Sequence, residues 1–335
     1  MLSIKDLASM TGYSVATISR VINGSPKVAD KTRVRVEEAI QKTGYHPNFA
    51  GRNLRLAASM RLLILLPTIE NTFYGDIIRG AESAASAAGY QLLIGVTQNR
   101  LEIEESYIKM LQSRQVDGII LANTSMDKHD LNRLAETFPV TLLAHTVDGA
   151  NVSSVSIDNV SAAYDAVQYL ISLGHRKIGM LSGYYYRNPS DKREAGLFQA
   201  MEDAGLSCDP RYIVRTEFNF TSSRKACQRL MEQPDPPTAI FCIADSIAIG
   251  AIRYLSDHDL SGRVSVMGFD NVLESEYFFS GISTVNQPKL ELGRTCVELI
   301  LNKISDISSP PEQIVLPHSL VLRGSTFPPQ EPSAR

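Results

Sequence analysis

The spacing of apolar residues in the first 45 positions predicts three short helices. In each pattern the apolar side chains recur at intervals of three and four, as expected for the buried face of a helix. These faces are Ile4, Leu7 and Ala8; Val15, Ile18, Val21 and Ile22; and Val34, Val36, Ala39 and Ile40. The expected N-terminal caps are Ser3 with Asp6, Ser14, and Asp30. The expected ends are Gly12, Asn23-Gly24 and Gly44.

After about residue 60, strand-like and helix-like patterns alternate. Leu62 to Leu66 is a continuous apolar run, typical of a strand buried on both faces. Further strands are predicted at 92–94, 118–121, 140–143, 177–181, 239–243 and 264–268. Helices are predicted near 74–88, 102–113, 129–136, 160–173, 191–204, 221–232 and 245–257. The fold class is therefore α/β: an all-α head followed by a two-lobed body of doubly wound parallel sheets.

Length and composition fit a globular chain of several domains. The 335 residues are too many for one ordinary domain, and 44% apolar with 21% charged residues is usual for globular proteins. No apolar run reaches the roughly 18–20 residues that a membrane helix needs. The first residues lack the pattern of a signal peptide. We therefore expect a cytoplasmic protein without a membrane partner.

Charge is distributed unevenly along the chain. Residues 1–58 contain nine Lys or Arg against four Asp or Glu, whereas the remainder contains 24 against 32. A basic head on an acidic body indicates that the head meets a polyanion. The four cysteines and six histidines are scattered, and no P-loop, G-x-G-x-x-G, G-x-S-x-G or H-E-x-x-H motif is present. We expect no metal, no cofactor and no enzymatic activity.

The three helices of the head have the layout of a helix-turn-helix, in which the first turn of the second helix reads base edges in the major groove. That turn carries Val15, Ala16 and Thr17, with Arg20 one turn further. The apolar pair suits a thymine methyl group, and the threonine hydroxyl suits a hydrogen bond. A small helical bundle with another role is the alternative. The residues predicted to bind DNA in this segment are Ser14, Val15, Ala16, Thr17, Arg20 and Asn23.

The segment after the third helix contains a candidate for a second DNA contact. Asn48 can cap a short helix after Pro47, and this helix carries Leu54 next to Arg55. An exposed leucine beside arginines suits an apolar wedge that enters the minor groove. A plain linker is the alternative interpretation.

Three segments resemble the lactose-repressor family: IKDLASMTGYSVATISRVING at 4–24, VADKTRVRVEEAIQKTGYHPN at 28–48 and GRNLR at 51–55. The similarity continues to residues 323–326 and so covers nearly the whole chain. It implies a homodimer that binds a palindromic, double-stranded operator, with Leu54 prying apart the central base step. Gly51 stands where alanine is usual in the family, and glycine weakens a helix by about 1 kcal/mol. We therefore predict that the hinge is helical only on DNA.

The resemblance and the patterns together predict the domain boundaries. They are a helix-turn-helix domain at 1–45, a hinge at 46–58, an effector-binding and dimerisation domain at 59–328 and a tail at 329–335. The first lobe of the effector domain is expected at about 59–158 and 288–317. The second lobe is expected at about 159–287 and 318–328. A small-molecule effector is expected between the lobes, beyond the carboxyl ends of the strands.

Effector-binding candidates follow the predicted strands. Phe73 and Tyr74 come after the first strand and suit stacking on a sugar or a base, or packing on the next helix. The resemblance assigns effector contacts to Arg193, in the motif R-x-x-G, and to Asp270; an interlobe salt bridge is the alternative for this pair. It also places Phe218 as an aromatic lid. The remaining candidates are Arg187, Asp245 and Gln287.

Within the family, residues 71–80 and 237–242 resemble the cytidine and purine repressors. His145 departs from both, because they carry an acidic residue there. It either contacts the effector or satisfies a buried backbone group. The effector is a sugar or sugar phosphate, or alternatively a nucleoside or purine. A solute-binding protein without DNA function is the alternative of another class.

Overall fold

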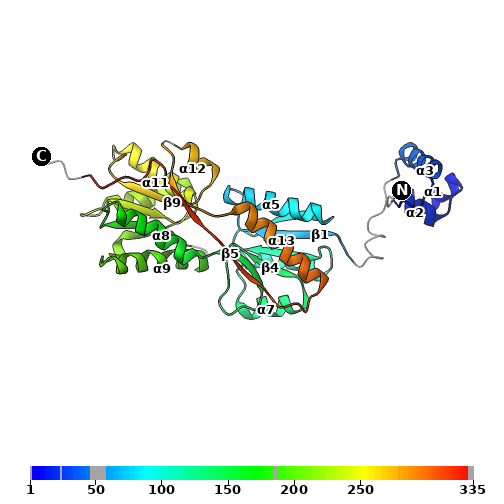
Figure 1. The fold of residues 1–335 in the computed structure, drawn as a ribbon, viewed down its shortest axis with the longest axis horizontal. Coiled ribbons are helices and arrows are strands. Elements are labelled where there is room, and N and C mark those ends of the chain that lie inside the picture. The colour runs from blue at the N-terminus through cyan, green and yellow to red at the C-terminus, as the bar shows by residue number, and fades with distance from the viewer. Residues whose placement is uncertain (1, 23–24, 46–57, 185–186, 279, 331–335) are drawn as a thin grey trace. The chain divides into compact units, whose positions relative to one another are not determined.

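The computed structural model describes residues 2–22, 25–45, 58–184, 187–278 and 280–330, except the side chains of residues 187 and 188. The chain divides between Ser59 and Met60 into two compact units, and each is described by itself (Figure 1). The first unit is the head, and the second is the body.

The head is a bundle of three helices: α1 (Ile4–Thr11), α2 (Val15–Ile22) and α3 (Asp30–Thr43). Its small core is formed by the buried residues Leu7, Ile18, Val21, Val36 and Tyr45. The predicted capping box at the start of α1 is confirmed, because the Ser3 and Asp6 side chains each accept a hydrogen bond from the other's backbone N–H. Gly12 and Gly44 end α1 and α3 with positive φ, which glycine adopts without strain.

Three details of the head differ from the sequence prediction. Asp30 is not the cap of α3; Ala29 holds that position, and no side chain caps the helix there. Val34 is 52% exposed, since residues two positions apart on a helix face different sides and Val36 occupies the core. Val15 is 37% exposed, because it lies at the first position of α2, one turn before the buried Ile18.

The body contains two six-stranded sheets. The first sheet has the order β11-β5-β4-β3-β1-β2 and is parallel throughout. Its strands are β1 (Arg61–Leu66), β2 (Gln91–Val96), β3 (Gly118–Ala122), β4 (Val140–Leu143), β5 (Ser153–Ile157) and β11 (Gln313–Leu316). Its helices are α5 (Phe73–Ala87), α6 (Leu101–Gln112), α7 (Lys128–Thr137) and α13 (Lys289–Ser305).

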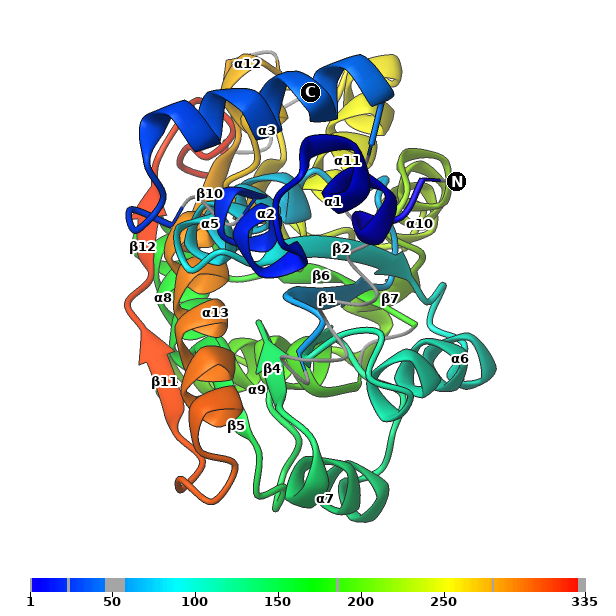
Figure 2. The same cartoon turned by 90° about the vertical axis from the view of Figure 1, so that its right-hand side faces the viewer.

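The continuous apolar run of β1 is explained by burial on both faces. Leu62, Ile64 and Leu66 belong to one core with α5 and α13. Leu63 and Leu65 belong to another core with α6 and α7, on the opposite face of the sheet (Figures 1 and 2). Both sides of this strand therefore need apolar residues, as parallel sheets covered by helices do.

The second sheet has the order β12-β10-β9-β8-β6-β7, and only β12 is antiparallel. Its strands are β6 (Ile178–Gly183), β7 (Ile213–Thr216), β8 (Ala239–Cys242), β9 (Ser265–Asp270), β10 (Ser283–Asn286) and β12 (Ser319–Val321). Its helices are α8 (Asn159–Ser172), α9 (Arg187–Asp203), α10 (Phe220–Met231), α11 (Asp245–Asp257), the short α12 (Leu273–Tyr277) and the 3-10 turn Pro210–Tyr212. The predicted α/β class, with an all-α head and a two-lobed body, is confirmed.

The chain crosses between the two sheet layers three times: from β5 to α8, from β10 to α13, and from β11 to β12. Helices α13 and α5 approach each other closely at Gly293. A Cβ atom added there would lie only 2.0 Å from the carbonyl oxygen of Ile77. None of the helices in the described ranges is long and apolar enough to cross a membrane.

Candidate effector-binding and DNA-binding sites

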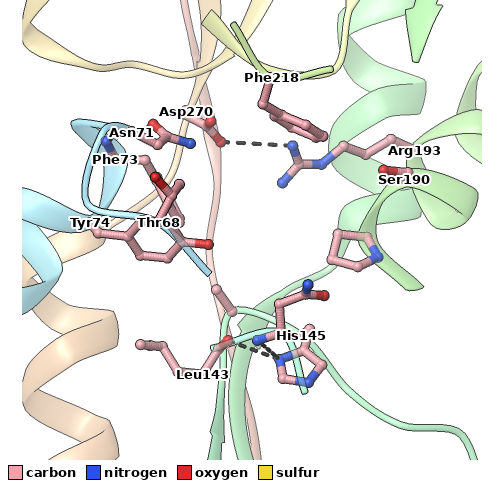
Figure 3. Close-up of a pocket in the computed structure, with 13 residues that line it drawn as sticks. Thr68, Asn71, Phe73, Tyr74, Leu143, His145, Ser190, Arg193, Phe218 and Asp270 are labelled. Carbon is pink, nitrogen blue, oxygen red and sulfur yellow. Dashed lines mark hydrogen bonds and ion pairs between the residues drawn. The ribbon is translucent and has the colours of Figure 1, made fainter. Parts of the chain in front are cut away.

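A pocket opens in the body between the carboxyl ends of strands from both sheets (Figure 3). Its free space is about 590 Å³, part of which is open to solvent. The lining residues from the first layer are Thr68, Asn71, Phe73, Tyr74, Asn123, Leu143, Ala144 and His145. Those from the second layer are Pro189, Ser190, Arg193, Phe218 and Asp270. The position, at the carboxyl ends of parallel strands, is typical of a site for a small molecule.

Arg193 and Asp270 form a buried ion pair in this pocket. Arg193 Nη1 lies 3.8 Å from Asp270 Oδ1, and the side chains are 8% and 6% exposed (Figure 3). The guanidinium lies 3.6 Å from the centre of the Phe269 ring. Burial raises the pKa of Asp270 to about 6, while nearby Arg193 opposes the rise. Both residues belong to the second layer, so the pair is not an interlobe salt bridge.

The arginine is fixed by its other hydrogen bonds. Its Nε donates to Asn159 Oδ1 at 2.8 Å, and its Nη1 donates to the carbonyl oxygen of Ile243. Within the described part of the chain, no hydrogen-bond partner lies at Nη2. The guanidinium therefore holds a fixed orientation and keeps donor capacity for a ligand.

Several lining residues have a strained backbone. Asn123, Ala144 and Asp270 have φ angles of 65°, 60° and 109°, in the left-handed region that favours glycine. Such conformations persist only where the surroundings hold them, and they cluster at binding sites. At Asp270 one holding contact comes from Gln287, whose Nε2 donates to Asp270 Oδ1 at 2.7 Å. Gln287 does not line the pocket itself and acts through Asp270.

Aromatic rings form the apolar part of the pocket. Phe73 and Tyr74 begin α5 and meet edge to face, with ring centres 5.2 Å apart. Asn71 Oδ1 accepts a hydrogen bond from the Phe73 N–H at 3.0 Å and so fixes the start of the helix. Phe218 lies across the pocket beside Arg193 (Figure 3). Rings on opposite sides are suited to enclosing a flat ligand or a sugar ring.

His145 lines the pocket and also satisfies buried backbone groups. Its Nδ1 lies 3.1 Å from the N–H of Asn123 and 3.0 Å from the carbonyl oxygen of Leu143. Its Nε2 lies 3.3 Å from the N–H of Thr124. Burial lowers the pKa of His145 to about 4, so the ring is neutral at pH 7. The interpretation that His145 satisfies buried backbone groups is therefore confirmed, and its contact with an effector stays a prediction.

Asp245 does not reach the pocket, and we withdraw it from the effector-binding candidates. Its carboxylate is buried at the start of α11 and accepts hydrogen bonds from the N–H of Val272, the Ser275 hydroxyl and the Thr284 hydroxyl. A carboxylate occupied by three protein donors is structural. Burial raises its pKa to about 7. The side chain of Arg187 lies outside the described residues.

The sequence prediction missed four polar lining residues: Thr68, Asn71, Asn123 and Ser190. Thr68 and Asn123 come directly after β1 and β3, so the rule that ligands meet the carboxyl ends of strands contained the signal for both. Ser190 lies on α9 one turn before Arg193. Its position on a helix gave no such signal.

In the head, the predicted reading turn is accessible. Val15 and Ala16 are exposed, Thr17 is half-buried and Arg20 is exposed. Ser14 Oγ accepts a hydrogen bond from the Thr17 N–H at 3.1 Å, which confirms Ser14 as the cap of α2. Ser14 Oγ also lies 2.9 Å from Thr17 Oγ1. The other DNA-binding candidates, Asn23, Leu54 and Arg55, lie outside the described residues, as does Gly51.

Comparison with protein families accounts for both units. Residues 3–48 match the bacterial regulatory proteins of the lacI family. Residues 59–323 match the periplasmic binding proteins and sugar binding domain of the LacI family. The chain therefore belongs to the LacI family. It is a DNA-binding transcriptional regulator with an effector-binding body, and it is not an enzyme.

Individual relatives match along almost the entire chain. The chain is 33% identical to the transcriptional repressor CytR of Escherichia coli K12 over 327 residues, which are 97% of this chain and 96% of CytR. It is 32% identical to the repressor PurR of Escherichia coli over 330 residues, 97% of each chain. The lac repressor dimer, bound to operator and the anti-inducer ONPF, shares the fold. Its TM-score is 0.86 at 23% identity, over 97% of this chain and 99% of that chain.

Proposed function

We propose that this protein is a cytoplasmic transcriptional repressor that binds a palindromic operator as a homodimer and responds to a small neutral molecule. The observation that carries the proposal is the buried pair of Arg193 and Asp270 in a pocket at the ends of two parallel sheets. Because the same chain carries a helix-turn-helix head, we assign this pocket to sensing a ligand. Dimer contacts are assigned to the body, because one head alone buries little area.

The DNA contacts are assigned to the first turn of α2. Exposed Val15 and Ala16 meet thymine methyl groups, and the Thr17 hydroxyl meets a base edge or a phosphate. Arg20, one turn further, meets the backbone. Ser14 and Asn23 border this helix and are assigned to the same surface. Leu54 and Arg55 are assigned to the minor groove between two half-sites one helical turn apart.

The charge of the pocket favours a neutral effector. In the described lining, Arg193 is the cation, and Asp270 already neutralises it. His145 is neutral at pH 7 because burial lowers its pKa to about 4. A phosphate group would bring two negative charges without a matching cation, which is costly away from water. This balance favours a sugar or a nucleoside over a sugar phosphate.

The remaining pocket residues suit either kind of neutral ligand. Phe73, Tyr74 and Phe218 supply flat apolar faces, whereas Arg193 and Asp270 supply donors and acceptors for hydroxyl or ring groups. We assign these five residues and His145 to effector contact, and Gln287 to supporting Asp270. A nucleoside- or purine-responsive repressor is the second candidate, favoured by the similarity to CytR and PurR.

Regulation is proposed to act through the angle between the lobes. A ligand that contacts both layers changes this angle, which alters the spacing of the two hinges at 46–58 in the dimer. The same proposal places the domain boundaries near 45, 58 and 328. Amide exchange on the free protein tests the hinge. Protection of segment 46–58 without DNA would contradict the prediction that the hinge is helical only on DNA.

Two binding experiments test the proposal. Electrophoretic shift on the DNA upstream of its own gene is expected to show one saturable complex. Thermal shift with cytidine, hypoxanthine, D-ribose, cellobiose and glucose 6-phosphate is expected to raise Tm with a neutral compound only. Arg193→Ala should keep the DNA complex and lose the thermal shift. Leu54→Ala should lose the DNA complex and keep the thermal shift. A chain that binds a sugar but no DNA would support the solute-binding alternative.

A further inference from the structure

A buried lysine lies at the start of α13, where the chain has just crossed from the second layer to the first. Lys289 is 7% exposed. Its Nζ donates hydrogen bonds to the carbonyl oxygens of Asp270 and Asn271, both at 2.7 Å. Within the described residues, no carboxylate lies within ion-pair distance of this ammonium. The two carbonyl groups are therefore its direct partners.

The two residues that Lys289 holds are the strained ones at the end of β9. Asp270 has φ of 109° and Asn271 has φ of 50°, so two consecutive residues other than glycine are left-handed. Such a turn relaxes unless its surroundings fix it. A charged donor to each carbonyl group is a strong way to fix it, because hydrogen bonds from an ammonium exceed those from neutral donors.

One other contact reaches the backbone of this turn, because Thr284 Oγ1 accepts a hydrogen bond from the Asn271 N–H at 3.3 Å. Gln287 holds the Asp270 carboxylate, and Arg323 Nη2 donates to Asn271 Oδ1 at 2.9 Å. Lys289 differs from all three because it bonds to the backbone of both strained residues. Lys289 thus helps to hold the backbone conformation from which the Asp270 side chain leaves the strand.

Helix α13 also reaches the aromatic side of the pocket. A Cβ atom at Gly80 would lie 2.1 Å from the carbonyl oxygen of Leu290, and one at Gly293 would lie 2.0 Å from that of Ile77. The backbones of α13 and α5 are therefore in direct contact. Helix α5 begins with Phe73 and Tyr74. The first turns of α13 therefore connect Asp270, which Lys289 contacts, with the aromatic wall formed by Phe73 and Tyr74.

We propose that Lys289 is a positioning residue for effector binding, which aims Asp270 into the pocket and fixes it relative to the aromatic wall carried by α5. This inference rests on the proposed effector site. It predicts that the ammonium matters through the conformation of the turn at 270–271, without touching the effector.

The test compares Lys289→Met with Lys289→Arg, using Lys109→Met at an exposed position of α6 as the matched control. Crystal structures report the φ angle of Asp270 and the distance from Arg193 Nη1 to Asp270 Oδ1. In Lys289→Met we expect the turn to relax and the carboxylate to leave Arg193. In Lys289→Arg we expect the wild-type turn, because a guanidinium can donate to both carbonyl groups.

Calorimetry with cytidine, hypoxanthine, D-ribose and cellobiose adds a functional readout. If the pocket-facing turn falls to about a tenth of the population, the Kd of a binding probe rises about tenfold. Lys289→Arg should restore binding, and Lys109→Met should leave it unchanged. If none of the four binds the wild type, the proposed effector class is wrong, and the crystal structures still decide the role of Lys289.

One result overturns the inference: a folded Lys289→Met variant in which Asp270 superposes on the wild type and faces Arg193 as before. If Lys289→Met does not fold, the structure of Lys289→Arg decides. A relaxed turn at 270–271 in that folded variant would also contradict the inference.

Discussion

Replacing His145 by asparagine should change how stability depends on pH. The buried imidazole has a pKa of about 4 in the folded protein, against 6.5 as the ordinary value. The unfolded chain therefore binds a proton more readily than the folded one, and the stability that neutral His145 provides is lost as pH falls below 6.5. Between pH 7 and pH 5, these two values correspond to about 2 kcal/mol of unfolding free energy.

The assay is urea unfolding of the full-length protein at both pH values, at constant protein concentration, with the variant beside the wild type. Asparagine keeps an oxygen that can accept from the Asn123 N–H and does not titrate. His145→Asn should therefore lose about 2 kcal/mol less than the wild type between pH 7 and pH 5. His129→Asn, at an exposed position, is the matched control and should follow the wild type. Equal losses in His145→Asn and wild type would refute the reasoning.

Three further predictions concern helix packing, a buried carboxyl group and DNA. Gly293→Ala should destabilise the body by about 1–3 kcal/mol in urea unfolding, because its Cβ atom would meet a carbonyl oxygen at 2.0 Å, whereas Gly75→Ala has open space and should not. Burial raises the pKa of Asp245 to about 7, so the folded state binds the proton more readily, and this residue adds about 2 kcal/mol of stability as the pH falls from 7 to 5. Asp245→Asn should remove that contribution; pH profiles parallel to the wild type would contradict this. Arg20→Ala should weaken operator binding and reduce the slope of log K against log salt by about 1, if the exposed side chain meets a phosphate; an unchanged slope would move the contact elsewhere.

The sequence predicted the body well where one physical rule determines the structure. The apolar run at 62–66 has a single explanation, burial on both faces, and β1 has that environment. Short or mixed strands were missed, among them β5, β7 and the edge strand β12. β7 contains an arginine, β5 is rich in serine, and β12 has three residues, so none forms the continuous apolar run that identified β1. Their pairing depends on neighbouring strands that are distant in sequence.

The candidate site shows the same limit at the level of single residues. Arg193 and Asp270 were named through the family resemblance, and the structure places them together in the pocket. Asp245 fits the same rule, since it follows β8, yet its carboxylate turns to three protein donors. Lys289 had no sequence signal, because nothing in a helix-starting lysine indicates a strained turn on another layer. Orientation of a side chain is decided by packing, and local sequence does not contain it.

The contacts that join the two layers around the pocket differ in burial, and this difference bears on how the pocket opens. Lys192 Nζ donates to Thr146 Oγ1 at 2.8 Å, and Thr72 Oγ1 donates to Glu274 Oε2 at 2.9 Å. Both pairs are at least partly exposed to solvent, so each contributes on the order of 0–1 kcal/mol and can break at little cost. Breaking the buried contacts of Lys289 would leave a charge without partners, which costs several kcal/mol. The lobes should therefore separate at the exposed contacts and turn about the start of α13, with Asp270 and the aromatic wall of α5 both held close to the axis.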